Sequence, residues 1–139
     1  PAGDRIRGLA AADRSRGSGK GLKMNDNGEN EQTFMIYFAS DIHLGAGSEE
    51  AARATERLFV RWLDEAARDA EAIFLVGDIF DFWFEYKRVV PKGFVRTLGK
   101  LAELTDRGIR VVFFTGNHDM WVTDYLTREC GVEICTAPS

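Results

Sequence analysis

Three runs of consecutive apolar residues recur along the chain, and the segments between them have the apolar spacing of helices. The runs cover residues 34–39, 72–76 and 110–114 and are rich in Phe, Ile, Val and Leu. Strands that are apolar at consecutive positions are typical of the centre of a sheet that is covered on both faces. The pattern therefore predicts three central strands, with a fourth at residues 132–135.

Helices are expected after the first two strands and before the last. The first is predicted to begin directly after Ser48, whose hydroxyl group is a suitable N-cap. The second begins near Pro91 and ends at Gly108, and the third spans residues 120–130 and ends at Gly131. This alternation of strands and helices with short connections predicts parallel strands in an α/β fold.

Composition divides the chain near residue 33. All 16 aromatic residues lie beyond it; residues 1–32 carry a net charge of +1 and the remaining 107 a net charge of −5. A segment without large apolar side chains cannot bury enough surface to offset its ordering, so residues 1–32 are expected to be a disordered tail. We expect Met24 to be the natural start, with residues 1–23 outside the natural protein; an Arg-rich targeting peptide is the alternative. The acidic body argues against broad nucleic-acid binding.

Polar side chains follow each of the three predicted strands. They are Ser-Asp-Ile-His at 40–43, Gly-Asp-Ile-Phe-Asp at 77–81 and Gly-Asn-His-Asp at 116–119, and they include both histidines of the chain. Each segment alone is also typical of a turn or a helix cap. The carboxyl ends of parallel strands, however, meet at one edge of the sheet, where ligands bind. Together the three segments predict a metal site, because carboxylate, amide and imidazole groups are metal ligands.

These three motifs, in this order, resemble those of the calcineurin-like metallophosphoesterase superfamily. The resemblance covers residues 33–139 and implies the N-terminal half of an α/β/β/α two-sheet sandwich. It implies two divalent metal ions, with Asp41 and His43 on the first, Asn117 on the second and Asp78 bridging both. Oxygen-rich ligands with little imidazole favour Mn²⁺.

His118 follows Asn117 and is expected to act on the phosphate group and not to bind a metal. Its implied catalytic role is to stabilise the charge that develops on the phosphate, or to protonate the leaving oxygen. Asp119 or Asp81 is expected to orient the histidine ring. The alternative is that His118 only caps the third helix.

Flanking residues narrow the resemblance to the UDP-2,3-diacylglucosamine hydrolases of lipid A biosynthesis. They are Phe-Ala-Ser-Asp-Ile-His-Leu-Gly at 38–45 and Leu-Val-Gly-Asp-Ile-Phe-Asp-Phe-Trp-Phe at 75–84. Well-known members of that family carry arginine where His118 stands, whereas histidine is usual in the wider superfamily. The aromatic, non-periodic insert at residues 80–90 is expected to contact acyl chains and headgroup, or alternatively to pack beneath a loop; its candidate contacts are Phe82, Trp83, Phe84, Tyr86, Lys87 and Arg88.

The resemblance implies hydrolysis of UDP-2,3-diacylglucosamine, a nucleotide-diphosphate lipid, to UMP and 2,3-diacylglucosamine 1-phosphate. The enzyme is expected to lie peripherally at the cytoplasmic face of the inner membrane. The superfamily completes its metal site with three further histidines, and the sequence has none after His118. We therefore expect a truncated fragment that is inactive by itself. The alternatives are a DNA nuclease of the same superfamily and a non-catalytic remnant.

Overall fold

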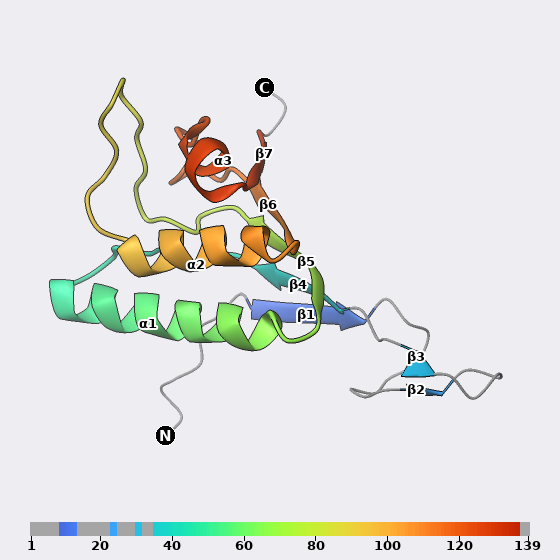
Figure 1. Ribbon diagram of the computed structural model, residues 1–139. Coiled ribbons are helices and arrows are strands. Elements are labelled where there is room, and N and C mark those ends of the chain that lie inside the picture. Colours follow the sequence, from blue (N-terminus) through green and yellow to red (C-terminus); the bar gives the residue numbers. More distant parts are fainter. Residues whose placement is uncertain (1–8, 14–22, 25–29, 32–34, 137–139) are drawn as a thin grey trace.

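Residues 9–13, 23–24, 30–31 and 35–136 are described by a computed structural model with an α/β fold (Figure 1). Its elements are β1 (Leu9–Asp13), β2 (Lys23–Met24), β3 (Asn30–Glu31), β4 (Met35–Ala39), α1 (Glu49–Ala66), β5 (Ala70–Val76), α2 (Val95–Asp106), β6 (Arg110–Phe114), α3 (Tyr125–Cys130) and β7 (Glu133–Cys135). The main sheet has the order β1-β4-β5-β6-β7, and β2 pairs with β3 separately. Strands β4 to β7 are mutually parallel, which confirms the predicted α/β class.

Helices α1 and α2 lie side by side over one face of the parallel strands, and the core fills the space between them (Figure 1). Alternate side chains along a strand point to opposite faces of the sheet. The fully buried set on the helix-covered side contains Phe59, Leu63, Ile73, Leu75, Leu101, Leu104 and Phe113. Burial of each such side chain stabilises the fold by about 1.5–3 kcal/mol.

The opposite face of the sheet carries a row of partly exposed aromatic rings. Phe38 and Phe114 are 36% and 38% exposed, and both lie against the ring of Phe74, at centroid distances of 5.4 and 6.1 Å. Within the described part of the chain no helix packs on this face. A bare second face is expected of one half of a two-sheet sandwich, and the cover on both faces that the apolar runs predict is not supplied by the described residues.

The first helix begins where the sequence predicts. Ser48 Oγ accepts a hydrogen bond from the backbone N–H of Ala51 at 3.1 Å, which confirms the predicted N-cap. The third helix begins at Tyr125 and not at residue 120, because the chain first makes a turn in which the N–H of Val122 donates to the carbonyl of Asp119 at 3.2 Å.

The second helix begins at Val95 and not near Pro91. The cause is the backbone at Gly93 and Phe94, which have φ values of 101° and 58°. Neither value is compatible with a right-handed helix. The ring of Phe94 packs edge-on against Phe80 at a centroid distance of 5.2 Å, and this contact joins the start of the helix to the core.

Part of the segment that composition predicts to be disordered forms strands. β1 lies antiparallel along the outer edge of β4, with Leu9 opposite Ala39 and Asp13 opposite Met35. This pairing uses backbone groups that an edge strand otherwise exposes, so it does not need the large side chains that the segment lacks. Strands β1, β2 and β3 fall within the segment 1–32, and the other residues of that segment lie outside the described residues.

Candidate metal centre

The loops that follow β4 and β5 run side by side and continue the register of the two strands. Asp41 N–H donates to the Gly77 carbonyl at 3.1 Å, and His43 N–H donates to the Asp78 carbonyl at 3.0 Å. The next bond joins Leu44 N–H to the Ile79 carbonyl at 2.8 Å. The backbone thereby fixes the two polar segments against each other before any side-chain contact is made.

Three residues of these loops have left-handed backbone conformations without being glycine. The φ angles are 53° at Asp41, 51° at His43 and 53° at Asp78. Such conformations cost about 1–3 kcal/mol each and persist only where the surroundings fix them. Ile42 and Leu44 supply part of that fixation, because both side chains are buried in the core between and beside the polar residues. Asp41 and His43 are more exposed than the buried side chains of Ile42 and Leu44.

Asp41, His43 and Asp78 form a compact group of metal-ligating side chains. One ligand atom of each lies within 4.8 Å of the others, and His43 Nε2 lies 3.9 Å from Asp41 Oδ1. Asn117 lines a depression of about 270 Å³ together with Asp41 and Asp78. Two carboxylates, an imidazole and an amide oxygen are donors that a divalent cation accepts, so the residues present fit the implied metal.

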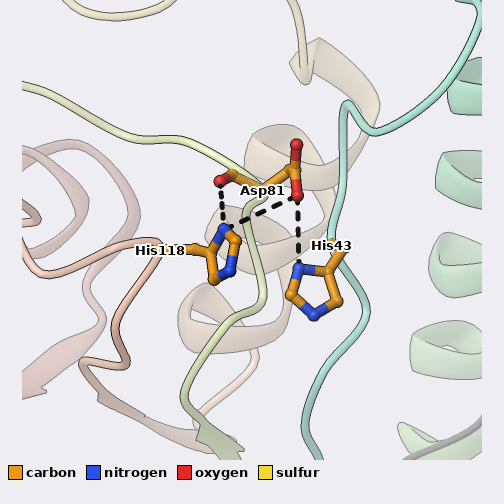
Figure 2. A group of neighbouring side chains, drawn as sticks. All are labelled: His43, Asp81 and His118. Carbon is orange, nitrogen blue, oxygen red and sulfur yellow. Dashed lines mark hydrogen bonds and ion pairs between the residues drawn. The ribbon is translucent and has the colours of Figure 1, made fainter.

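Asp81 lies between the two histidines of the chain (Figure 2). Its Oδ1 is 3.3 Å from His43 Nδ1 and 3.7 Å from His118 Nδ1, and its backbone carbonyl is 3.0 Å from His118 Nδ1. The two imidazole rings meet edge to face at a centroid distance of 4.8 Å. Of the two carboxylates that the sequence leaves open as partners for His118, Asp81 is therefore the one beside its ring.

Asp119 lies elsewhere, and the expectation that it orients the His118 ring needs correction. Its side chain is fully buried, and its two oxygens accept hydrogen bonds from four backbone N–H groups. The donors belong to Asp78, Ile79, Phe80 and Gly116, at 3.2, 2.8, 3.3 and 2.7 Å. Asp119 thus contacts the backbone of the loops and not the histidine ring.

The insert at residues 80–90 forms a long loop that projects from the body, yellow-green in Figure 1. Some of the predicted substrate contacts on this loop are exposed, and one is buried. Phe82 and Tyr86 are 63% and 57% exposed, and Lys87 Nζ lies 5.4 Å from the centre of the Tyr86 ring. Lys87 and Arg88 are exposed as well. Trp83 is a correction: it is fully buried against Phe80, Phe94 and Tyr125, so it packs beneath the loop.

Two exposed side chains beyond the Gly-Asn-His-Asp motif were not predicted from the sequence. Trp121 is 55% exposed and meets Phe84 at a ring-centroid distance of 5.8 Å, and Met120 beside it is 54% exposed. Both follow the Gly-Asn-His-Asp motif directly, at positions that the sequence assigned to the third helix. Their closeness in sequence to a motif of candidate metal ligands is the signal that could have identified them.

Glu85 fixes the insert to the start of α3. Its carboxylate accepts hydrogen bonds from Trp83 Nε1, from the N–H and the hydroxyl of Thr123, and from the N–H of Tyr125, at 2.9, 2.8, 2.6 and 3.1 Å. Desolvation by burial raises the pKa of Glu85, but these hydrogen bonds outweigh it, so the pKa lies below its usual value. Glu85 is consequently a charged clamp between the loop and the helix.

A parallel sheet that gathers oxygen and imidazole donors beyond the carboxyl ends of its strands is the architecture of a metal-dependent α/β enzyme. Residues 34–134 match the family model of the calcineurin-like phosphoesterases, and the chain belongs to that family. The family inferred from the three sequence motifs is thereby confirmed.

Among curated proteins the chain is similar to several UDP-2,3-diacylglucosamine hydrolases. It is 52% identical over 99 residues to that of Porphyromonas gingivalis, covering 71% of this chain and 38% of the relative. It is 33% identical over 105 residues to that of Pseudomonas aeruginosa, covering 75% and 41%. The relative from Nitrosococcus oceani is 31% identical over 104 residues, covering 74% and 39%. The chain therefore spans about two fifths of the length of the curated relatives it matches.

Proposed function

We propose that the protein carrying this sequence is a dinuclear metallophosphoesterase that hydrolyses UDP-2,3-diacylglucosamine to UMP and 2,3-diacylglucosamine 1-phosphate. The observation that carries the proposal is the convergence of Asp41, His43 and Asp78, whose ligand atoms lie within 4.8 Å of one another inside the region that matches the family. The substrate follows from the similarity to hydrolases of that name.

Four residues would hold the metal ions in this proposal. Asp41 and His43 would hold the first ion, Asn117 would hold the second, and Asp78 would be shared between the two. The oxygen-rich set favours Mn²⁺. When bound, divalent cations supply neutralisation of phosphate charge and activation of water at neutral pH.

His118 would act on the phosphate group, with Asp81 as its partner. The Asp81 carbonyl oxygen can only accept a hydrogen bond, so at 3.0 Å it favours a proton on His118 Nδ1. This leaves Nε2 to contact a phosphate oxygen or, in the imidazolium form, to protonate the leaving group.

The exposed aromatic side chains of the insert would bind the acyl chains of the substrate, with Lys87 and Arg88 beside them for phosphate or headgroup charge. The same surface supports a peripheral contact with the cytoplasmic face of the inner membrane, since aromatic and basic side chains together suit a lipid–water interface. None of the described helices is long and apolar enough to cross a membrane.

The test measures UMP release from UDP-2,3-diacylglucosamine by the natural full-length protein in the presence of Mn²⁺. Asp78→Ala removes the bridging carboxylate and should lower the rate by about a hundredfold or more. Asp106→Ala, the same change at an exposed position at the end of α2, is the matched control and should keep the wild-type rate. Equal turnover by Asp78→Ala would remove the metal mechanism, and DNA cleavage without UMP release would favour the nuclease.

A further inference from the structure

The side chain of Asp119 is a buried carboxylate whose hydrogen bonds all go to two loops. Oδ1 accepts from the N–H groups of Asp78 and Gly116, and Oδ2 accepts from those of Ile79 and Phe80. Charged acceptors strengthen such bonds, and a buried carboxylate is tolerated only where they are made. Asp119 therefore binds the β5 loop (residues 77–80) to the β6 loop (residues 116–119).

The two loops approach each other more closely than side chains would allow. A Cβ atom on Gly116 would lie 2.5 Å from Asp78 Oδ1 and 2.6 Å from Asp78 N, and one on Gly77 would lie 3.3 Å from Gly116 Cα. Asp78 also binds the β6 loop in return, because its Oδ1 accepts from the N–H of His118 at 2.8 Å. The contact between the loops is thus made from both sides, with glycine at the point of closest approach.

From this geometry we propose that Asp119 is a positioning residue for the metal centre. It holds the left-handed backbone of Asp78 (φ 53°) and the β6 loop in one arrangement, so that Asp78 and Asn117 present their oxygens to the same depression. Asp119 acts through these two residues and touches neither metal nor substrate. The inference rests on the proposed function, since it takes Asp78 and Asn117 as metal ligands.

Asp119→Asn keeps the shape of the side chain but removes the charge of the carboxylate and one of its two acceptor oxygens. An asparagine side chain has one acceptor oxygen, so it can keep the bonds on one side only and must direct its N–H₂ group at the backbone donors on the other. At least two of the four amides then lose their acceptor. Asp119→Glu keeps both oxygens but adds a methylene group in a fully buried position, so it should impair the arrangement less.

Glu85→Gln is a matched control, because Glu85 also accepts four hydrogen bonds, three of them from the main chain or side chain of residues 123 and 125. The Glu85 carboxylate is not among the candidate metal ligands that the described residues bring together. A general loss of stability would affect this variant as well, whereas a loss of metal-ligand positioning would not.

The experiment measures Mn²⁺ affinity of the natural full-length protein and its three variants from the electron paramagnetic resonance signal of free Mn²⁺. Amide hydrogen exchange of residues 78–80 and 116 is measured without metal. We expect Asp119→Asn to weaken Mn²⁺ binding by about 10–100-fold and to speed exchange at these amides. Asp119→Glu should be intermediate, and Glu85→Gln should bind Mn²⁺ as the wild type does.

Wild-type Mn²⁺ affinity in Asp119→Asn, together with faster exchange at the four amides, would overturn the inference and leave the proposed function intact. Equal losses in Asp119→Asn and Glu85→Gln would overturn it too, because the effect would then be one of stability alone. If Asp119→Asn does not fold, Asp119→Glu decides: unchanged Mn²⁺ affinity despite faster exchange contradicts the positioning role. Failure of the wild type to bind Mn²⁺ would instead overturn the proposed function.

Discussion

The Glu85 carboxylate accepts four hydrogen bonds from backbone and side-chain donors. Its contribution to the stability of the fold can be measured. Its pKa lies below the usual value because the hydrogen bonds from Thr123, Trp83 and Tyr125 outweigh desolvation by burial. A carboxylate whose pKa falls on folding stabilises the protein above its unfolded pKa, about 4.3 for glutamate, and loses that contribution as the pH falls through the folded pKa. The clamp between the insert and α3 should therefore weaken in acid.

Glu85→Gln should lower the free energy of unfolding by about 1–3 kcal/mol at pH 7, and the difference from the wild type should shrink as the pH falls below about 4.3. Urea unfolding at several pH values measures it. Glu129→Gln, the same change at an exposed position of α3, should have little effect. A wild-type-to-Gln difference that stays constant down to pH 3 would show that the charge of Glu85 contributes nothing.

Single residues were predictable from the sequence where their role depends on near neighbours. Ser48 caps α1 through a residue three positions away, and Asp41, His43 and Asp78 follow strands that the apolar pattern predicts. Asp119 and Glu85 take donors about 40 positions away in the sequence, such as Ile79 and Thr123. Local patterns carry no signal for such partners, which explains why Asp119 and Asp81 remained alternatives as the partner of His118.

Helix α2 depends on a neighbouring helix for its N-terminal cap. Phe94 at its N-cap position makes no side-chain cap hydrogen bond. Instead Glu56 of α1, which is only 7% exposed, accepts from the N–H of Thr97 at 3.4 Å and from its hydroxyl at 3.0 Å. Because the capping side chain belongs to another helix, the residues at the start of α2 carry no capping signal. The start of α2 was therefore predicted near Pro91, too early in the sequence.

Thr97→Val nearly preserves the shape of a fully buried side chain and removes the hydroxyl donor. The Glu56 carboxylate then keeps one long hydrogen bond in a buried site, so the free energy of unfolding should fall by about 1–3 kcal/mol. Chemical denaturation monitored by tryptophan fluorescence measures this loss.

Arg53→Ala supplies the comparison for the contact between Glu56 and Thr97. It breaks an exposed pair with Glu49 on the same helix and should cost no more than about 0.5 kcal/mol. If Thr97→Val were as mild as Arg53→Ala, Glu56 would not be an effective cap for α2.

At the scale of the whole molecule, the two faces of the sheet differ in a way that the apolar runs do not reveal. Consecutive apolar residues at 34–39 and 110–114 predicted cover on both sides, but the described helices cover one side only. The runs specify which residues avoid water and do not specify what covers them. The parallel direction of the strands was predictable because a helix between two strands of one sheet forms a crossover connection.

The partly exposed rings of Phe38, Phe74 and Phe114 form one continuous row, and Val76 beside them is 44% exposed. Contiguous apolar surface of this kind favours association. We expect the 139-residue chain to self-associate through this face, and the double variant Phe38→Thr/Phe114→Thr to shift it toward monomer. Threonine suits a strand and removes most of the exposed apolar area. Sedimentation velocity over a range of concentrations measures the shift, with circular dichroism to verify the fold.

Val95→Ser is the control for this face, because Val95 is 74% exposed but lies in the first turn of α2, away from the aromatic row. It removes exposed apolar area without changing the sheet, so self-association should persist in this variant. A comparable shift toward monomer in Val95→Ser would mean that any exposed apolar side chain drives association. A monomeric wild type would mean that the aromatic row is too small to do so, and the sheet face would then need no cover to remain in water.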